Sequence, residues 1–182
     1  MLSIINGNNS NNTNISATSK PSQAAIEQEN LLIEKKNLIN IFKLVIKDLI
    51  DSSSIKLNKN KIIEASTSYN QFFDVFENIL NHGFRGRKGL YYLSFQKKDY
   101  SSLLDIVESK FDNMNKNLKT IKEISEIKTS LGRVRAWLRI LLMQKQLAET
   151  FDLLVQEKAL LTEIYESGSI MLSDEANIIS GS

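Results

Sequence analysis

Residues 129–147 read TSLGRVRAWLRILLMQKQL, and this stretch shows the helical pattern that decides the fold class. Projected at about 100° per residue, its aliphatic side chains share one arc with Trp137 at the edge: Leu131, Val134, Leu138, Leu141 and Leu142. Thr129 or Ser130 is a suitable N-cap residue for such a helix. The pattern predicts a long amphipathic helix that continues to about Leu147 and buries its apolar arc.

A longer helix is predicted over residues 24–52. Apolar residues recur there at intervals of seven, at Leu31, Leu38 and Val45, and a second apolar row lies beside them. An arc this wide is typical of a helix packed into a bundle rather than of a narrow two-stranded coiled coil, so the oligomeric state stays open. We expect the run 51–54 (Asp-Ser-Ser-Ser) to break the helix.

A second helix, dense in aromatic residues, is predicted to run to His82 and to end at Gly83. Phe72 and Phe76 share one face of it, which we expect to be core. Glycine suits the left-handed conformation that ends a helix, and a cation just before it suits the helix dipole. We therefore expect His82 to be a terminal cap or a packed ring rather than a catalytic group, because no second histidine or cysteine exists to complete a site.

The remaining helices are predicted to be short. They cover residues 90–95, 100–111, the region around Leu118 and Ile121, 149–165 as one or two helices, and 173–179. One proline and seven glycines are few turn-forming residues for a chain of 182. We therefore predict an all-α fold, a single compact bundle of seven to nine helices over residues 22–182, which follows a disordered Asn/Ser-rich tail at 1–21.

The composition excludes several classes of function. Cysteine is absent and histidine occurs once, so a disulfide framework, a thiol nucleophile and a multi-histidine metal site are all removed. No catalytic constellation remains, and we expect a protein that is not an enzyme and holds no cofactor or metal. A net charge of +2 is too balanced for a protein that coats nucleic acid. With no run of ~20 apolar residues and no secretion signal, we expect a cytoplasmic protein.

The five arginines lie in two short segments, whereas the 18 lysines are spread over the chain. Arg85 and Arg87 belong to the first segment, and Arg133, Arg135 and Arg139 belong to the second. Arginine is the cation suited to bidentate contacts with carboxylates and to interfaces. The two segments are therefore the candidate binding residues of the chain.

Within the second segment, Arg135 and Arg139 project side by side at one edge of the apolar arc. Arg133 projects from the other edge, next to Trp137. Lys145 falls within the apolar arc near the end of the predicted helix, where we expect it to snorkel, pair with an acid or lie at a contact. For each arginine the alternative is an ion pair within the domain, which is the commonest fate of a surface arginine.

The sequence GFRGRKG at residues 83–89 admits three functional interpretations besides that of a plain glycine-rich connection between helices. A phosphate loop is excluded, because the segment lacks GxxxxGK[ST] and GxGxxG and follows no strand. Its GxxG spacing occurs in KH nucleic-acid-binding loops, but we find no flanking strands of that domain. The third interpretation is a basic, exposed loop in which Arg85, Arg87 and Lys88 contact an acidic protein surface or phosphoinositide headgroups.

Ordered blocks of the sequence resemble the RUN domain family. Residues 76–84 (FENILNHGF) resemble its first block, in which an acidic residue is followed by a hydrophobic pair and His-Gly. Residues 129–147 resemble its most diagnostic block, GRxRAWLR followed by a KxL ending. Residues 160–166 (LLTEIYE) and 173–176 (SDEA) are similar to its closing blocks, so the resemblance covers about residues 30–179.

The resemblance implies an all-helical, non-enzymatic binding module. Such a module is an effector or adaptor for a small GTPase of the Rab, Rap or Arf-like class, in vesicle traffic or cell polarity. Carried over to this chain, it implies that basic residues of these blocks form the partner-binding surface, with Arg133 fitting least well: Arg85, Arg87, Lys88, Arg133, Arg135, Arg139 and Lys145. The alternative is a peripheral membrane or phosphoinositide-binding module that uses the basic loop.

The sequence also departs from the family pattern. Leu141 stands where many members have alanine, and Gly168-Ser169 replaces a helical stretch that contains alanine. The chain reaches Ser182 where members usually continue through a final apolar helix. We therefore expect the domain over residues 22–182 to lack that helix or to leave a groove open.

Overall fold

The computed structural model describes residues 22–57, 67–86 and 99–180. Within these ranges it contains eight α-helices, two short 3-10 helices and no strand, which confirms the predicted all-α bundle. The elements are α1 (Gln23–Leu57), α2 (Thr67–Asn81), α3 (Ser101–Lys110), α4 (Asp112–Glu123), α5 (Ser130–Met143), α6 (Leu147–Gln156), α7 (Lys158–Ile164), η2 (Ile170–Leu172), η3 (Asp174–Ala176) and α8 (Asn177–Ser180). The tail at 1–21 and the predicted helix at 90–95 lie outside the described residues.

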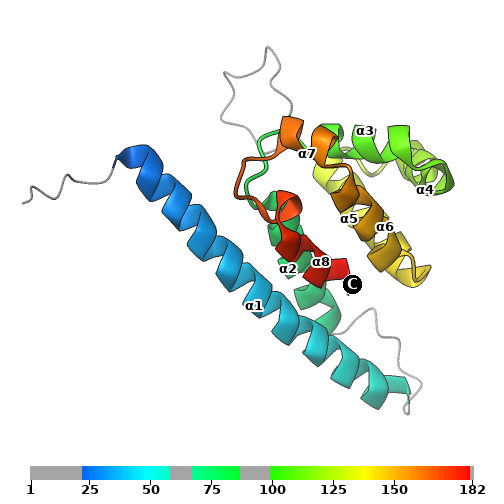
Figure 1. The fold of residues 1–182 in the computed structure, drawn as a ribbon. Helices are drawn as coiled ribbons and strands as arrows, with labels where there is room; N and C mark the ends of the chain where they lie inside the picture. The colour runs from blue at the N-terminus through cyan, green and yellow to red at the C-terminus, as the bar shows by residue number, and fades with distance from the viewer. Residues whose placement is uncertain (1–21, 58–66, 87–98, 181–182) are drawn as a thin grey trace, which may run out of the picture.

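Helix α1 is the longest element and lies along α2 at one edge of the molecule (Figure 1). The ring of Phe42 packs between Phe72 and Phe76 of α2, with centroid separations of 5.9 and 6.0 Å. Phe76 in turn meets Phe151 of α6 edge to face at 5.3 Å. Aromatic pairs at these separations add to the free energy gained by burying their area. A chain of phenylalanines therefore joins α1, α2 and α6 through one core.

Helix α5 lies against α4 and α6 and places its apolar arc in the core. Val134, Leu138 and Leu141 are buried, and Trp137 is only 2% exposed. Thr129 is the N-cap, because its side-chain oxygen accepts a hydrogen bond from the amide of Gly132 at 3.0 Å. The helical pattern and the cap predicted for this stretch are confirmed.

The predicted break in the first helix is wrong. Helix α1 continues through residues 51–54 and ends at Leu57. Serine is only a moderately poor helix former, so three in a row do not stop a helix that tertiary contacts hold. Ser52 supplies one such contact, because its hydroxyl lies 2.9 Å from that of Ser68 in α2.

The predicted end of the fifth helix is also wrong, because α5 stops at Met143 rather than near Leu147. The amide of Gln146 donates to the carbonyl of Leu141 at 2.8 Å, and the amide of Lys145 donates to that of Leu142 at 3.1 Å. This pair of bonds is a Schellman motif, which requires a left-handed residue after the C-cap. Lys145 takes that conformation, with φ of 59°.

Candidate partner-binding site

Arg135 forms a bidentate ion pair across the seam between α5 and α2. Its Nε donates to one carboxylate oxygen of Glu77 at 2.7 Å, and a terminal nitrogen donates to the other at 3.0 Å. This two-point geometry fixes the guanidinium more firmly than a single contact would. The hydrogen bond to Glu77 raises the pKa of Arg135, although the side chain remains half-exposed. The alternative fate considered for each arginine, an ion pair within the domain, is thus the one that Arg135 has.

Arg139 lies one turn further along α5 and is held by a different contact. Its guanidinium carbon stands 4.9 Å from the centre of the Phe73 ring of α2, and a terminal nitrogen donates to the carbonyl of Arg135 at 3.4 Å. A cation over an aromatic face is attracted by the ring's quadrupole. The two arginines lie side by side, as their projection indicated, and the structure turns both toward α2.

Met143 continues the same row, four residues beyond Arg139. Its side chain is 70% exposed, the largest exposed fraction among the large hydrophobic residues that the structure describes. Side chains at i, i+4 and i+8 share one face of a helix, so two oriented cations and one free thioether follow each other along α5. We call these three residues, with Phe73 and Glu77 of α2, the α2–α5 surface.

The sequence analysis missed Phe73, Glu77 and Met143 as members of a site. Met143 was open to prediction from its four-residue spacing to Arg139. Glu77 lies 58 residues from Arg135 along the chain, so no local pattern connects the two. Phe73 is buried with the other phenylalanines of α2, but one face of its ring carries Arg139.

Tyr100 lies near the Arg135–Glu77 pair and interacts electrostatically with both residues. Its hydroxyl donates to the side-chain oxygen of Asn81 at 3.2 Å, and its ring stacks on Phe84 at 4.8 Å. Burial, and after it the negative charge of Glu77, raises the pKa of Tyr100 to about 12, while Arg135 acts in the opposite direction. Tyr100 is thus a neutral, buried side chain that packs next to the α2–α5 surface.

Arg85 is placed away from the α2–α5 surface, at the end of α7. One of its terminal nitrogens donates to the carbonyls of Tyr165 at 2.5 Å and Thr162 at 3.3 Å. Its own amide donates to the carbonyl of Ile164 at 2.8 Å. A guanidinium in this position satisfies free carbonyls at the negative end of a helix. Arg85 therefore caps the C-terminal end of α7 and has a structural role in the fold.

Arg87 and Lys88 lie outside the described residues. The described residues on either side of that gap, Gly86 and Asp99, are close together, because a Cβ built on Gly86 would lie 3.7 Å from the carbonyl oxygen of Asp99. Tyr100, the next residue, donates from its amide to the hydroxyl of Ser130 at 3.0 Å. Both ends of the gap therefore meet near the first turn of α5.

Arg133 and Lys145 do not join the α2–α5 surface. Arg133 lies beside the Trp137 edge of α5 as expected, and its Nε is buried without a hydrogen-bond partner, as is the indole nitrogen of Trp137. Lys145 is exposed beyond the end of α5. The expectation that Lys145 falls within the apolar arc is wrong, because the helix stops two residues before it and the backbone turns to positive φ.

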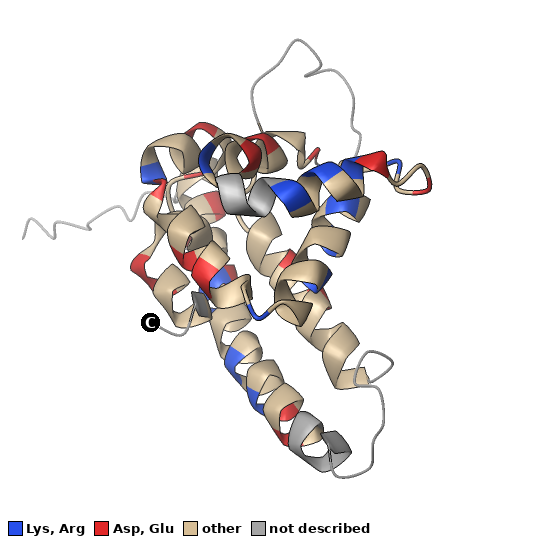
Figure 2. Ribbon diagram, turned by 90° about the vertical axis from the view of Figure 1, so that its right-hand side faces the viewer, with Lys and Arg blue, Asp and Glu red and all other residues tan. Residues whose placement is uncertain are grey.

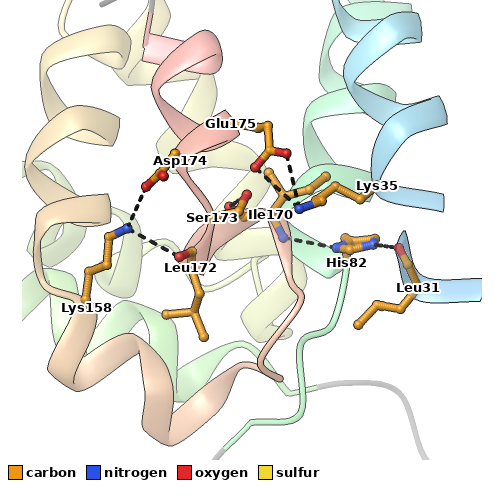
Figure 3. Close-up of polar contacts among 9 residues, drawn as sticks. All are labelled: Leu31, Lys35, His82, Lys158, Ile170, Leu172, Ser173, Asp174 and Glu175. Carbon is orange, nitrogen blue, oxygen red and sulfur yellow. Dashed lines mark hydrogen bonds and ion pairs between the residues drawn. The ribbon is translucent and has the colours of Figure 1, made fainter. Parts of the chain in front are cut away.

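His82 is a packed ring that links three segments (Figure 3). Its Nδ1 accepts a hydrogen bond from the amide of Ile170 at 3.1 Å, and its Nε2 lies 2.8 Å from the carbonyl oxygen of Leu31. An acceptor Nδ1 and a donor Nε2 define the neutral ring. The expected packed ring is confirmed, but the suggested cation at the helix end is not. Gly83 ends α2 with φ of 67°, as predicted.

Two ion pairs surround the same junction (Figure 3). Lys35 of α1 reaches Glu175 of η3 at 3.3 Å, and Lys158 of α7 reaches Asp174 at 3.6 Å. Hydrogen bonds within the C-terminal turn, chiefly from the backbone and Ser173, lower the pKa of Glu175. Asp174 and Glu175 of the SDEA stretch thus hold the C-terminal turns against α1 and α7.

Charge of both signs is spread over the helices (Figure 2). In this view both blue and red segments occur on several of the described helices. None of the described helices is long and apolar enough to cross a bilayer. The described residues also contain no group of three or more His, Asp or Glu side chains arranged to hold a metal ion.

Comparison with known proteins assigns the fold to a family. The family model described as the RUN domain matches residues 71–182, which is more than half of the chain. The chain belongs to the RUN domain family. This membership confirms the resemblance seen in the sequence blocks, and α1 lies entirely before the matched range.

Individual relatives are matched over most of this chain. Protein RUFY3 from Homo sapiens is 37% identical over 170 residues, which cover 92% of this chain and 35% of that protein. RUN and FYVE domain-containing proteins 2 and 1 from Homo sapiens are 35% and 34% identical, over 82% and 83% of this chain and 24% and 21% of their own lengths. The chain thus spans about a third or less of these curated relatives.

Proposed function

We propose that this RUN domain is a non-enzymatic adaptor that binds a small GTPase of the Rab, Rap or Arf-like class through its α2–α5 surface. The observation that carries the proposal is the row Arg135, Arg139 and Met143 on one face of α5. Glu77 and Phe73 hold the two guanidinium groups in place before a partner arrives. Side chains that are already ordered lose less conformational entropy on binding.

The residue types of this surface match those of protein interfaces. Arginine and methionine are enriched in interfaces, whereas lysine is depleted. The exposed Met143 supplies apolar area, and its flexible thioether adapts to the shape of a partner. An acidic, nucleotide-dependent surface of a GTPase would meet both arginines, and the charges would mainly speed the encounter.

The proposal places the protein in the cytoplasm, with recruitment to membranes through its partner. A direct membrane contact through the basic loop has less support, because Arg85 uses its guanidinium on the carbonyls of α7. The few cations that remain would each contribute about 1 kcal/mol near an anionic leaflet, which gives only marginal recruitment. Flotation with anionic liposomes tests this alternative, and we expect no stable binding.

A pulldown with a panel of Rab, Rap and Arf-like GTPases tests the main proposal. Each GTPase is loaded in parallel with GDP and with a non-hydrolysable GTP analogue, and the full chain is the bait. We expect nucleotide-dependent capture of one or two of them, and loss of that capture with Arg139→Glu. Lys119→Glu on α4 makes the same charge change at an exposed residue that is not part of the α2–α5 surface, and it should leave capture intact. Capture of none by a folded chain would contradict the proposal.

A further inference from the structure

Asp74 of α2 is an exposed acid beside the α2–α5 surface. It lies one turn before Glu77, and side chains three residues apart are neighbours on a helix. Its main-chain carbonyl accepts a hydrogen bond from the side chain of Asn78 at 2.9 Å. Among the residues that the structure describes, its carboxylate has neither a hydrogen bond nor an ion pair. No contact within this part of the fold therefore neutralises the charge of Asp74.

Two contacts between the helices show where Asp74 lies relative to α5. Glu77 bonds to Arg135. Phe73, one turn earlier in α2, contacts Arg139, one turn later in α5. The two helices therefore run in opposite directions along their seam, and Asp74, the neighbour of Phe73, lies at the level of Arg139. Besides the hydrogen bond to Glu77, the negative charge of Asp74 raises the pKa of Arg135, so the carboxylate acts on this group of charges.

Arg139 is a cation without an acid on the same surface. Glu77 already forms its two hydrogen bonds with Arg135. The guanidinium of Arg139 instead lies over the ring of Phe73 and donates to the carbonyl of Arg135. No carboxylate among the described residues pairs with it. The structure thus presents two opposite charges at one level of the seam, Asp74 and Arg139, and neither is paired within the described fold.

A partner that covers the α2–α5 surface removes water from both of these charges. An ionised group that loses its water and gains no opposite charge weakens binding strongly. A partner acid that approaches Arg139 is also repelled by Asp74, because like charges brought together across an interface disfavour the complex. A surface made of acids alone would therefore suit Arg139 but not Asp74.

We propose that Asp74 is a further partner-binding residue, which selects a GTPase whose contact surface carries a basic side chain beside the acid that meets Arg139. This inference rests on the proposed function, because it requires that the partner cover the α2–α5 surface. A GTPase that has the acid but lacks the base is bound less well, since specificity is a difference between two affinities. Glu77 differs from Asp74, because Arg135 already pairs with it.

The rate constants of the captured GTPase, loaded with the non-hydrolysable GTP analogue, test the role of Asp74 in the full chain. We expect Asp74→Asn to weaken the affinity by about fivefold or more, mainly through faster dissociation, because a contact within the interface is lost. Asp74→Glu keeps the charge and should recover most of the affinity. Asp48→Asn on α1 makes the same change at an exposed residue that is not part of the α2–α5 surface, and it should leave the affinity within about twofold. Circular dichroism verifies that all three variants are folded.

The sign of the effect decides whether Asp74 contacts a base. If Asp74 only repels an acidic partner, its removal speeds association and leaves the affinity equal or higher. That result for Asp74→Asn, together with loss of binding in Arg139→Glu, would overturn the inference and leave the proposed function intact. Binding that survives Arg139→Glu would contradict the proposed function and this inference together.

Charge reversal then identifies the base on the partner. Asp74→Lys should abolish capture of the unaltered GTPase, because two cations would meet. Each exposed lysine and arginine of the captured GTPase is replaced in turn by glutamate. We expect one of these GTPase variants to bind the Asp74→Lys chain at least about fivefold more tightly than it binds the unaltered chain. If none of them does so, Asp74 contacts no basic side chain and the inference is refuted.

Discussion

Arg135 and Glu77 face each other across the seam of α5 and α2 with two hydrogen bonds of 2.7 and 3.0 Å. The pair orients a guanidinium for a partner while it partly neutralises its charge. Glu77 lowers the attraction of Arg135 for an acidic partner, because it competes with any acidic group that approaches the guanidinium. Removal of the Glu77 charge should therefore speed the association with an acidic partner rather than slow it.

Glu77→Gln should raise the association rate with an acidic partner by a few-fold at low salt, because it exposes the full charge of Arg135. The free energy of unfolding should fall by less than about 1 kcal/mol, since a half-exposed ion pair contributes little. Surface plasmon resonance and urea denaturation measure the two effects. Glu123→Gln on α4 is the control with the same charge change, and an equal gain in rate there would show that net charge alone is responsible.

Two variants of Lys145 distinguish the effect of its backbone strain from the effect of its side chain. Lys145→Gly should stabilise the fold by up to about 1 kcal/mol, because glycine adopts positive φ without steric cost. Lys145→Ala removes the same charge but keeps the strain, so it should not stabilise. Thermal denaturation measures the difference. If Lys145 contacts the GTPase, both variants weaken binding alike, and a difference between them in affinity would argue against a contact by the side chain.

Two glycines at positive φ differ in the space around them. A Cβ on Gly83 would lie 2.6 Å from the Cβ of Ser169, whereas the nearest atom to a Cβ on Gly86 is 3.7 Å away. Both alanine variants lose the left-handed preference of glycine, which costs about 1 kcal/mol. Gly83→Ala should therefore be clearly more destabilising than Gly86→Ala in urea denaturation. Equal losses of unfolding free energy in the two variants would mean that Ser169, which precedes η2, moves away from residue 83 without cost.

Alkaline pH should destabilise the fold through Tyr100. Its pKa is raised to about 12 in the folded state, whereas an unfolded tyrosine titrates near 10. The folded chain thus binds the proton more tightly, so the stabilisation is complete below pH 10 and is lost as the pH rises toward 12. Tyr100→Phe should flatten this decrease in urea denaturation series at pH 9 to 11. An unchanged slope in the variant would assign the decrease to other groups, such as the buried Tyr165, whose pKa burial also raises.

Much of the fold was predictable because its signals are local. The apolar arc of α5, the N-cap at Thr129 and the glycine that ends α2 are each defined by neighbouring residues. The end of α5 was not predictable in this way, because no glycine or proline stands between Met143 and Leu147. There a lysine takes the left-handed position, and the burial of Leu147 in the next helix compensates for it.

The candidate site was predictable only in part, because its partners come from distant segments. The projection of α5 placed Arg135 and Arg139 on one edge, and the structure turns both toward α2. The role of Arg85 depends on the carbonyl of Tyr165, 80 residues later, which composition and spacing do not reveal.

The most direct test of the central claim is the association rate of the captured GTPase with the full chain as salt is raised. We expect the double variant Arg135→Glu/Arg139→Glu to reduce the rate by at least tenfold at low salt and to lose most of its salt dependence. Lys116→Glu/Lys119→Glu on α4, with the same change in net charge, should leave the rate within about twofold. Association that is unchanged in the arginine variant would contradict the assignment of the α2–α5 surface as the partner-binding site.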